Sequence, residues 1–289
     1  MKKVTQILVF SSLFVSMLLA HVSTSAQNIK PDADNAGLTL PKGFAALKVA
    51  DNLGRTRHIV VNKQGAIYAK LERLDNGKGV LVLKDTDGDG RAETKTSFGN
   101  YTGTGIAIKG NYLYAASNKE VFKYALNDNG DIVDENAAAT IVTGLVDKGQ
   151  HNSKSITLDN AGNIYVNVGA PSNSCQEKDR TKGSMGMMPC PILDSAGGIW
   201  QFKVDQLNQS YASGVRYATG LRNVVGLDWN NQLNQLFVTQ HGRDMLNNLF
   251  PDLYDTTTSA ELPSETMYAI KKGDNAGWPY VYYDHIKGK

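Results

Sequence analysis

The feature that most constrains this chain is a strand-turn-strand motif that occurs four times between residues 58 and 238. Each copy has a short run of aliphatic and β-branched residues, a turn containing Gly or Asn, and a second run that includes an aromatic residue. That aromatic residue is Tyr68, Tyr114, Tyr165 and Phe237 in turn, which gives intervals of 46, 51 and 72 residues. The four copies cover residues 58–69, 105–115, 155–166 and 225–238.

This period predicts an all-β chain and, within that class, a β-propeller, because one blade takes about 40 to 50 residues. A β-sandwich also contains many short strands, but its strands do not return as one motif at this spacing. A further strand is expected after each copy, as at residues 80–84, 120–124 and 198–202. The third interval is long because an insertion containing both cysteines and residues 185–189 separates the second and third strands of that unit.

The first 26 residues have the layout of a cleaved secretory signal, with Lys2 and Lys3 before an apolar run and small residues at 23–26. The alternative is a retained membrane anchor, which needs about 20 apolar residues, whereas serines interrupt this run. We therefore predict a periplasmic or secreted protein with no membrane span after cleavage.

After the signal segment we expect a lead-in at residues 27–44 and a propeller domain at residues 45–289. Because six blades of about 45 residues need about 270 residues, we expect about four blades here and a ring that is incomplete at its C-terminal end.

Composition excludes some functions. Thirty basic and 28 acidic residues give a net charge of +2, so the sequence lacks the excess of positive charge that is typical of nucleic-acid-binding proteins. The only two cysteines, Cys175 and Cys190, are expected to form a disulfide in an oxidising compartment. Such a bridge is worth roughly 3 kcal/mol in the chain-entropy model. Two unpaired buried thiols are the alternative.

An acidic loop is a candidate calcium site. Asp85, Asp87, Asp89 and Glu93 alternate with small residues and glycines, and such a loop can wrap carboxylate oxygens around a hard cation. Thr96 stands where an EF-hand has its bidentate Glu, so this is not an EF-hand. We expect a structural calcium loop, with a solvated turn that binds no ion as the alternative.

Two blade junctions contain side chains that can do chemistry. His151 directly precedes the first strand of the third copy, where a propeller brings its loops to the top face near the axis. A histidine there can act as a general base near neutral pH, although a lone loop histidine is often structural. Arg222 and Asn223 occupy the corresponding junction of the fourth copy. The alternative for each arginine alone is a surface salt bridge.

The loop after the second strand of the fourth copy offers further ligands. Gln240, Gly242, Arg243 and Asp244 lie there, and loops of this kind can present main-chain carbonyls and a carboxylate to calcium and a guanidinium to an anionic ligand.

In this order along the chain, these segments together resemble the glucose/sorbosone dehydrogenase family. Its soluble members are six-bladed propellers that use pyrroloquinoline quinone (PQQ) and calcium. The matching segments are residues 85–93, His151 with the strand ending at 165–169, 220–223, 226–227, 240–244 and 277–279.

The resemblance implies oxidation of an aldose or sorbosone-like sugar by hydride transfer to PQQ. His151 would accept the hydroxyl proton, and Arg222 would stabilise charge on a cofactor oxygen. The cofactor-binding set would be Arg222, Asn223, Gln240 and Arg243. The main-chain carbonyls of Gly242 and Arg243, together with Asp244, would bind the cofactor-linked calcium. An electron acceptor such as a cytochrome or a quinone would reoxidise the cofactor.

The sequence also departs from the family pattern. Gln150 precedes the histidine where one branch has an acidic residue, no glutamine matches near residues 103–105, and the Lys and Arg residues that grip the quinone would lie beyond Lys289. A non-catalytic exported propeller that binds glycan or protein on its top face is therefore the main alternative. A calcium-dependent lactonase-like propeller is a third possibility, although that class needs a central Glu/Asn/Asp cluster.

Overall fold

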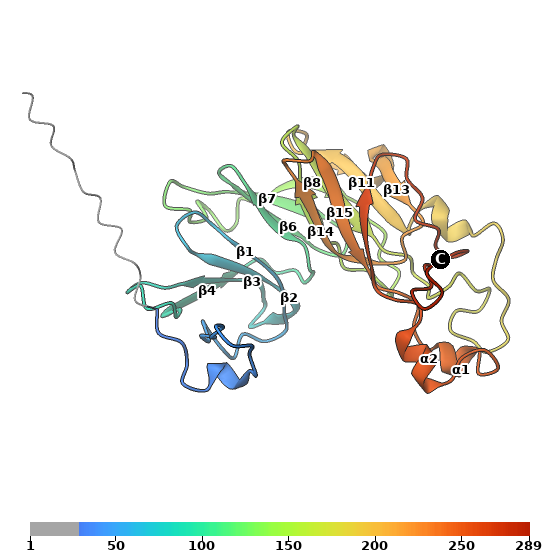
Figure 1. Cartoon of the computed structure of the whole chain (residues 1–289). Helices are drawn as coiled ribbons and strands as arrows, with labels where there is room; N and C mark the ends of the chain where they lie inside the picture. Colours follow the sequence, from blue (N-terminus) through green and yellow to red (C-terminus); the bar gives the residue numbers. More distant parts are fainter. Residues whose placement is uncertain (1–28) are drawn as a thin grey trace, which may run out of the picture.

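The computed structural model describes residues 29–289, so the predicted signal segment lies outside the described residues. The described strands form four sheets arranged as propeller blades (Figure 1). Blade 1 contains β1 (Thr56–Val61), β2 (Ile67–Asp75), β3 (Lys78–Lys84) and β4 (Thr94–Phe98); blade 2 contains β5 (Ile106–Lys109), β6 (Tyr112–Ala116), β7 (Val121–Ala125) and β8 (Ala139–Thr143); blade 3 contains β9 (Ile156–Leu158), β10 (Asn163–Val168), β11 (Gly198–Lys203) and β13 (Val215–Thr219); blade 4 contains β14 (Val224–Asn230), β15 (Gln235–Gln240) and β16 (Thr266–Ile270).

These sheets confirm the propeller prediction. Each of the four repeated motifs forms the first two antiparallel strands of one blade, and the three further predicted strands are β3, β7 and β11. The turn between β9 and β10 shows why the motif needs its glycine. Gly162 has φ +78°, a conformation that a residue with a Cβ rarely adopts.

The first strands of the blades, β1, β5, β9 and β14, lie next to one another around a central channel. The Thr157 hydroxyl of β9, for example, lies 3.4 Å from an Asp228 carboxylate oxygen on β14. The loops that precede the four innermost strands all lie at one end of the molecule, and successive strands within a blade run in opposite directions. We call the end of the molecule that carries those preceding loops the top face. The β10–β11 and β15–β16 connections also lie there.

The core consists of apolar layers between neighbouring blades. Tyr68 and Tyr124 lie between blades 1 and 2. Along β10, Ile164 faces blade 2, whereas Tyr165 faces blade 4, where it stacks on Trp229 with ring centroids 5.0 Å apart. This alternation follows from the two-residue period of a strand. Because both faces of the strand are covered, all of β10 is buried.

Some elements had no clear signal in the sequence. They are the outer strands β4, β8 and β13, the short strand β12 (Gln209–Ser210) that pairs in parallel with β8, the 3-10 turns η1 (Asn35–Gly37), η2 (Pro191–Asp194) and η3 (Tyr211–Ser213), and the helices α1 (Leu246–Leu249) and α2 (Thr256–Glu261). Within residues 29–289, none of the helices has the length and hydropathy needed to cross a bilayer.

Candidate functional site

A pocket of about 180 Å³ lies at the top of the channel, where the four innermost strands begin. Every blade contributes to its lining: Arg57 from blade 1, Thr104 from blade 2, His151 from blade 3 and Asn223 from blade 4 are among its residues. The structure therefore brings together two of the predicted residues, His151 and Asn223, which lie 72 positions apart in the sequence.

The imidazole of His151 has a defined orientation. Its Nδ1 lies 2.5 Å from the carbonyl oxygen of Ala170. Because a carbonyl only accepts, Nδ1 carries the proton in this contact and Nε2 keeps its lone pair. Burial lowers the pKa of His151, opposed by the Ala170 hydrogen bond and reinforced by the charges of Arg222 and Arg180. The arrangement leaves a neutral imidazole with a free basic nitrogen beside the pocket.

The close approach of His151 to its neighbours depends on Gly169. A Cβ at that position would lie 2.6 Å from Cβ of His151 and 2.8 Å from Oδ1 of Asn223. Carbon atoms do not approach so closely without a shift of the backbone, so a larger residue at position 169 would displace both side chains.

The guanidinium of Arg222 is buried beneath the top face, with 3% of the residue exposed. Its Nε and Nη2 donate to the main-chain and side-chain oxygens of Asn173 at 3.1 and 3.0 Å. Nη2 also lies 3.3 Å from Asp244. Within the described residues Nη1 makes no hydrogen bond, and it is not among the buried unpaired atoms. One donor of this buried cation therefore remains free.

The predicted ligands around Gln240 lie beside Arg222. The Gln240 side chain accepts a 2.7 Å hydrogen bond from the Arg222 main-chain nitrogen, and Arg243 stacks over the ring of Tyr282. The carbonyl oxygens of Gly242 and Arg243 accept no hydrogen bond from any described residue. The Asp244 carboxylate, in contrast, is already paired with Arg180 and Arg222. Its pKa is lowered, because those two arginines outweigh the opposing effect of burial.

His241 stands between Gln240 and Gly242 in the sequence, but its side chain is 53% exposed, and Nδ1 pairs with Glu265 at 2.8 Å.

Several residues of the site are not predicted by the sequence patterns. Thr104 belongs to the blade 2 junction equivalent to His151, and its hydroxyl is buried without a partner among the described residues. Arg57 occupies the same level of blade 1. Comparing all four junctions would have identified both. Asn173 gave no such signal, because its importance depends on contacts with residues about 50 to 105 positions away.

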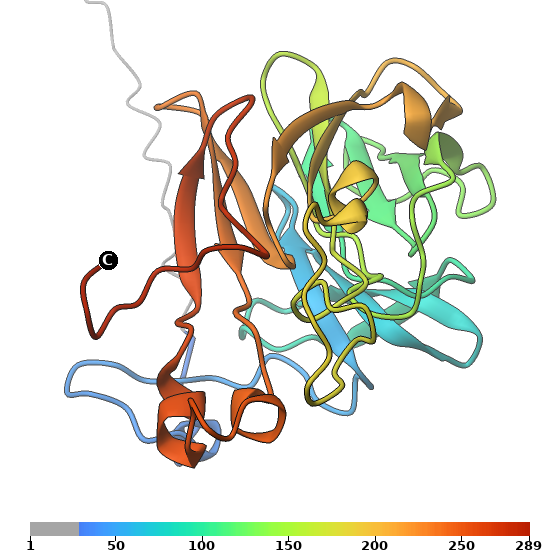
Figure 2. The ribbon, with the colours of Figure 1, turned by 90° about the vertical axis from the view of Figure 1, so that its right-hand side faces the viewer.

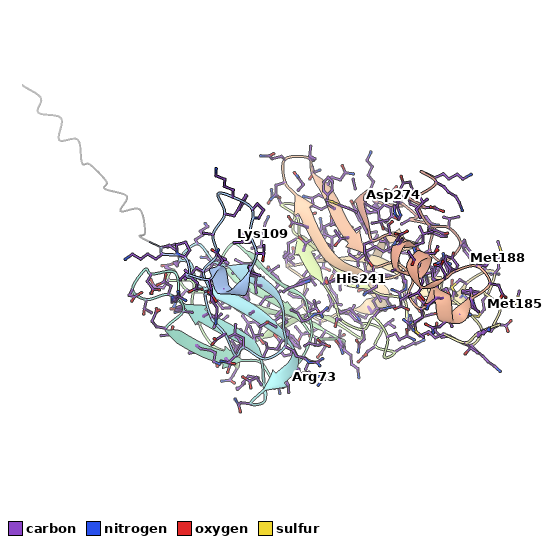
Figure 3. The ribbon with its side chains drawn as sticks, turned by 60° about the horizontal axis from the view of Figure 1, so that its bottom comes forward. Arg73, Lys109, Met185, Met188, His241 and Asp274 are labelled. Carbon is purple, nitrogen blue, oxygen red and sulfur yellow. A yellow bond between two sulfur atoms is a disulfide. The ribbon has the colours of Figure 1, made fainter. Side chains whose placement is uncertain are left out.

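The insertion predicted in the third unit is present between β10 and β11, and we call residues 169–197 the top-face insert. Figures 1 and 2 show it beside α1 and α2. A disulfide joins Cys175 and Cys190, with Cα atoms 6.2 Å apart. Met185 and Met188 lie on its outer surface, with 71% and 86% of each residue exposed (Figure 3).

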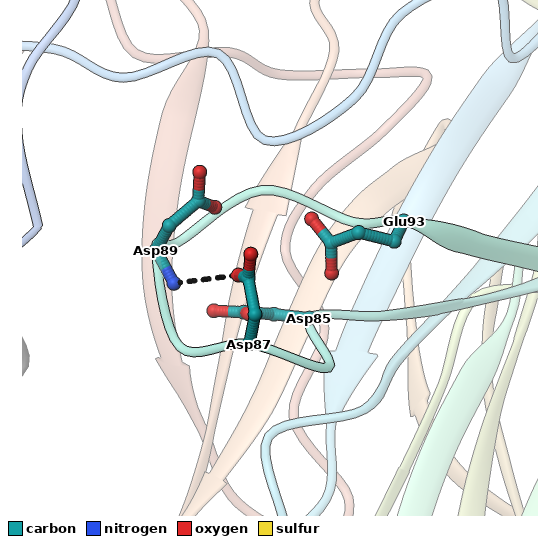
Figure 4. A group of neighbouring side chains, drawn as sticks. All are labelled: Asp85, Asp87, Asp89 and Glu93. Carbon is teal, nitrogen blue, oxygen red and sulfur yellow. Dashed lines mark hydrogen bonds between the residues drawn. The ribbon is translucent and has the colours of Figure 1, made fainter.

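The acidic loop lies between β3 and β4, at the end of blade 1 opposite the top face. One oxygen of each of its four acidic side chains lies within 4.8 Å of the others (Figure 4). Asp85 also accepts hydrogen bonds from the nitrogens of Gly88 and Gly90 at 2.6 and 2.8 Å. The loop is thus preorganised but distant from His151, which separates any ion bound there from chemistry at the top pocket.

Fold and site together define an all-β propeller with two adjoining top-face features: a polar pocket that contains His151 and Asn223, and a second pocket, lined by the buried Arg222 with Gln240, Gly242 and Arg243. The family model described as TrAA12-like matches residues 38–283. The chain therefore belongs to the TrAA12-like family.

Individual relatives agree with this placement. A curated PQQ-dependent sugar dehydrogenase of Hypocrea jecorina (strain QM6a) is 23% identical over 277 residues, and the match covers 90% of this chain and 61% of that protein. The Trichoderma reesei structure of carbohydrate-active enzyme family AA12 with iodide aligns with a TM-score of 0.65 at 20% identity, over 82% of this chain and 59% of that one. The holo PQQ domain of pyranose dehydrogenase from Coprinopsis cinerea aligns with a TM-score of 0.58 at 18% identity, over 71% and 48%. The chain thus spans about three fifths of the first two relatives.

Proposed function

We propose that this chain provides the catalytic top face of an exported, PQQ-dependent dehydrogenase that oxidises an aldose or a related sugar. The observation that carries the proposal is the His151 imidazole, which is oriented through Nδ1 and keeps Nε2 free beside a pocket shared with Asn223. Membership of the TrAA12-like family and the curated relative's function support the same assignment.

The described residues offer groups that fit this cofactor. Nη1 of Arg222 is a free cationic donor, and the unpaired carbonyls of Gly242 and Arg243 are hard oxygen ligands that suit calcium. Asp244 already forms ion pairs with Arg180 and Arg222. We therefore propose that Asp244 holds Arg222 and that the carbonyls of Gly242 and Arg243 bind the metal. When bound, PQQ would supply the hydride acceptor.

The residues of the chain would then perform separable tasks. Nε2 of His151 accepts the proton of the sugar hydroxyl as the hydride leaves the carbon that bears this hydroxyl. An alcohol thereby becomes a carbonyl, and a hemiacetal becomes a lactone. The free Arg222 donor stabilises negative charge that develops nearby. Asn223 and the unpartnered Thr104 hydroxyl can orient the sugar through hydrogen bonds.

The proposal is tested with the purified protein supplied with PQQ, calcium and an artificial electron acceptor. Aldose-dependent reduction of that acceptor is the expected result. If the protein binds sugars and PQQ but reduces no acceptor with any aldose, the enzymatic proposal fails, and a binding role for the top face is supported instead. A cytochrome or a quinone is the proposed physiological acceptor.

The pH profile of that reaction has a predicted acid limb. Protonation of Nε2 abolishes its role as a base, and burial lowers the pKa of His151 from its ordinary value of 6.5. We therefore expect the midpoint of the acid limb of kcat/KM to lie below pH 6.5. Removing the nearby positive charge with Arg180→Met should move the limb to higher pH. A wild-type limb with its midpoint above pH 6.5 would show that another group controls the reaction.

We also propose that the acidic loop binds a structural calcium ion. Calcium about 100-fold above its dissociation constant should stabilise the PQQ-free protein by about 2.7 kcal/mol and raise the melting temperature by roughly 5 to 10 °C. A matched double variant, Asp87→Asn with Glu93→Gln, should lose this response. If both proteins show equal shifts in a thermal melt, calcium binds elsewhere.

A further inference from the structure

The top-face insert contacts both proposed catalytic residues. Its Ala170 carbonyl binds Nδ1 of His151. Farther along, Asp179 accepts a 2.6 Å hydrogen bond from Gln150, and Arg180 donates to the same glutamine at 3.1 Å. Gln150 thus fastens the histidine loop to the insert and does not act on the imidazole directly.

Asn173 of the insert forms hydrogen bonds with three residues outside it, Arg222, Asp244 and Trp278. Asn173 is fully buried. Its main-chain oxygen accepts from Nε of Arg222 and from the Trp278 indole at 3.1 and 3.0 Å. Its side-chain oxygen accepts from Nη2 of Arg222 and from the Asp244 nitrogen at 3.0 and 3.1 Å, and its amide nitrogen donates to the Asp244 carbonyl at 2.8 Å. One residue therefore grips two nitrogens of the guanidinium and the loop that carries its counter-ion.

The disulfide holds Asn173 in this position. Cys175 is only two residues away and fully buried, and its nitrogen donates to the Ser172 hydroxyl at 2.9 Å. That hydroxyl and the Asn173 nitrogen both donate to one oxygen of Asp179, at 2.6 and 2.9 Å. Cys190 closes the other end of the segment and packs with Cys175 and Trp278 in one apolar cluster. Breaking the bridge frees one end of the segment on which these bonds depend.

We propose that Asn173 is the positioning residue for Arg222, and that the Cys175–Cys190 disulfide makes this positioning sensitive to reduction. Asn173 satisfies the Nε and Nη2 edge of the guanidinium and leaves Nη1 as the donor for a ligand. Without the Asn173 side chain, Nη2 of Arg222 loses its acceptor, and the guanidinium keeps only the main-chain carbonyl of residue 173 and the Asp244 carboxylate, which is 54% exposed and is shared with Arg180. The buried cation then gains freedom to rotate towards solvent. The functional meaning of this positioning rests on the proposed role of Arg222 in sugar oxidation.

The test measures how accessible the Arg222 guanidinium is to a chemical reagent, and it does not require the protein to be active. The PQQ-free protein is treated with phenylglyoxal, which modifies accessible arginines, and the adduct on the peptide containing Arg222 is followed by mass spectrometry. We expect modification to be roughly ten-fold faster in Asn173→Ala and in the reduced wild-type protein than in the oxidised wild type. Asn173→Asp keeps the acceptor oxygen and should keep Arg222 protected. Asn160→Ala, on a turn at the opposite end of blade 3, is the matched control and should change nothing.

The outcomes separate this inference from the proposed function. Unchanged Arg222 reactivity in Asn173→Ala, with far-UV circular dichroism showing a folded protein, overturns the inference whatever the activity. If Asn173→Ala does not fold, Cys175→Ser with Cys190→Ser provides the same test below its melting temperature, and protected Arg222 in that variant overturns the inference. Faster modification in a protein that oxidises no sugar supports the positioning role and counts only against the proposed function. In an active enzyme, Asn173→Ala should lower kcat and PQQ affinity and should move the acid limb towards higher pH, because the Arg222 charge that helps to lower the pKa of His151 moves away.

Discussion

Replacing His151 by Asn should lower kcat for sugar oxidation by about 10² to 10⁴-fold, the usual contribution of a general base. Asn is the informative substitution because His151 has φ +50°, and Asn tolerates this left-handed conformation better than Ala does. The variant therefore removes the basic nitrogen with little backbone strain. The measurement is acceptor reduction at saturating sugar with PQQ and calcium.

His285→Ala is the control for this variant, since His285 is exposed and its side chain hydrogen-bonds only to the Ser264 hydroxyl among the described residues. We expect it to keep wild-type turnover. His151→Asn should remain folded and bind PQQ, and a loss of less than about three-fold in kcat would remove His151 from the mechanism.

Replacing Tyr165 by Ala should cost about 3 to 5 kcal/mol of unfolding free energy, as is typical for removal of a large buried aromatic side chain. The Tyr165 ring stacks on Trp229 and makes an edge contact with Tyr217, so its loss opens a cavity between blades 3 and 4. The measurement is equilibrium unfolding in urea, followed by tryptophan fluorescence.

The matched variant Tyr165→Phe keeps the ring and removes the hydroxyl, which donates to a carboxylate oxygen of Asp159 at 2.9 Å. Asn163 also donates to that oxygen, so the carboxylate keeps a partner, and we expect a loss of only about 1 kcal/mol. Equal losses in the Ala and Phe variants would mean that the hydroxyl, and not the packing between blades, stabilises this interface.

The inner half of each blade could be predicted from sequence because its information is local. Alternating apolar residues and a glycine turn specify a hairpin, as at Gly162, and the recurrence of that hairpin specifies the propeller. The outer strands lack this signal. β4 has mostly exposed residues, and its place depends on pairing with β3.

Comparison of equivalent blade junctions predicted which side chains from different blades lie close together. That reasoning identified His151 and Asn223, which the structure places in one pocket. It could not foresee that Arg222 is held by Asn173, because the partners come from different blade connections and the contact exists only after both are folded. The loop after the second strand of the fourth copy also led to Asp244 being predicted as a calcium ligand, although folding places the Asp244 carboxylate against two arginines.

The most direct test of the central proposal follows the bound quinone itself. The protein is loaded with PQQ and calcium, unbound cofactor is removed, and an aldose is added without any electron acceptor. The account predicts that the sugar changes the absorbance of the bound quinone to that of its reduced form in the wild type, and that His151→Asn binds the quinone but leaves it oxidised. Quinone that stays oxidised in the wild type with every aldose, or that is reduced equally fast in His151→Asn, would contradict it.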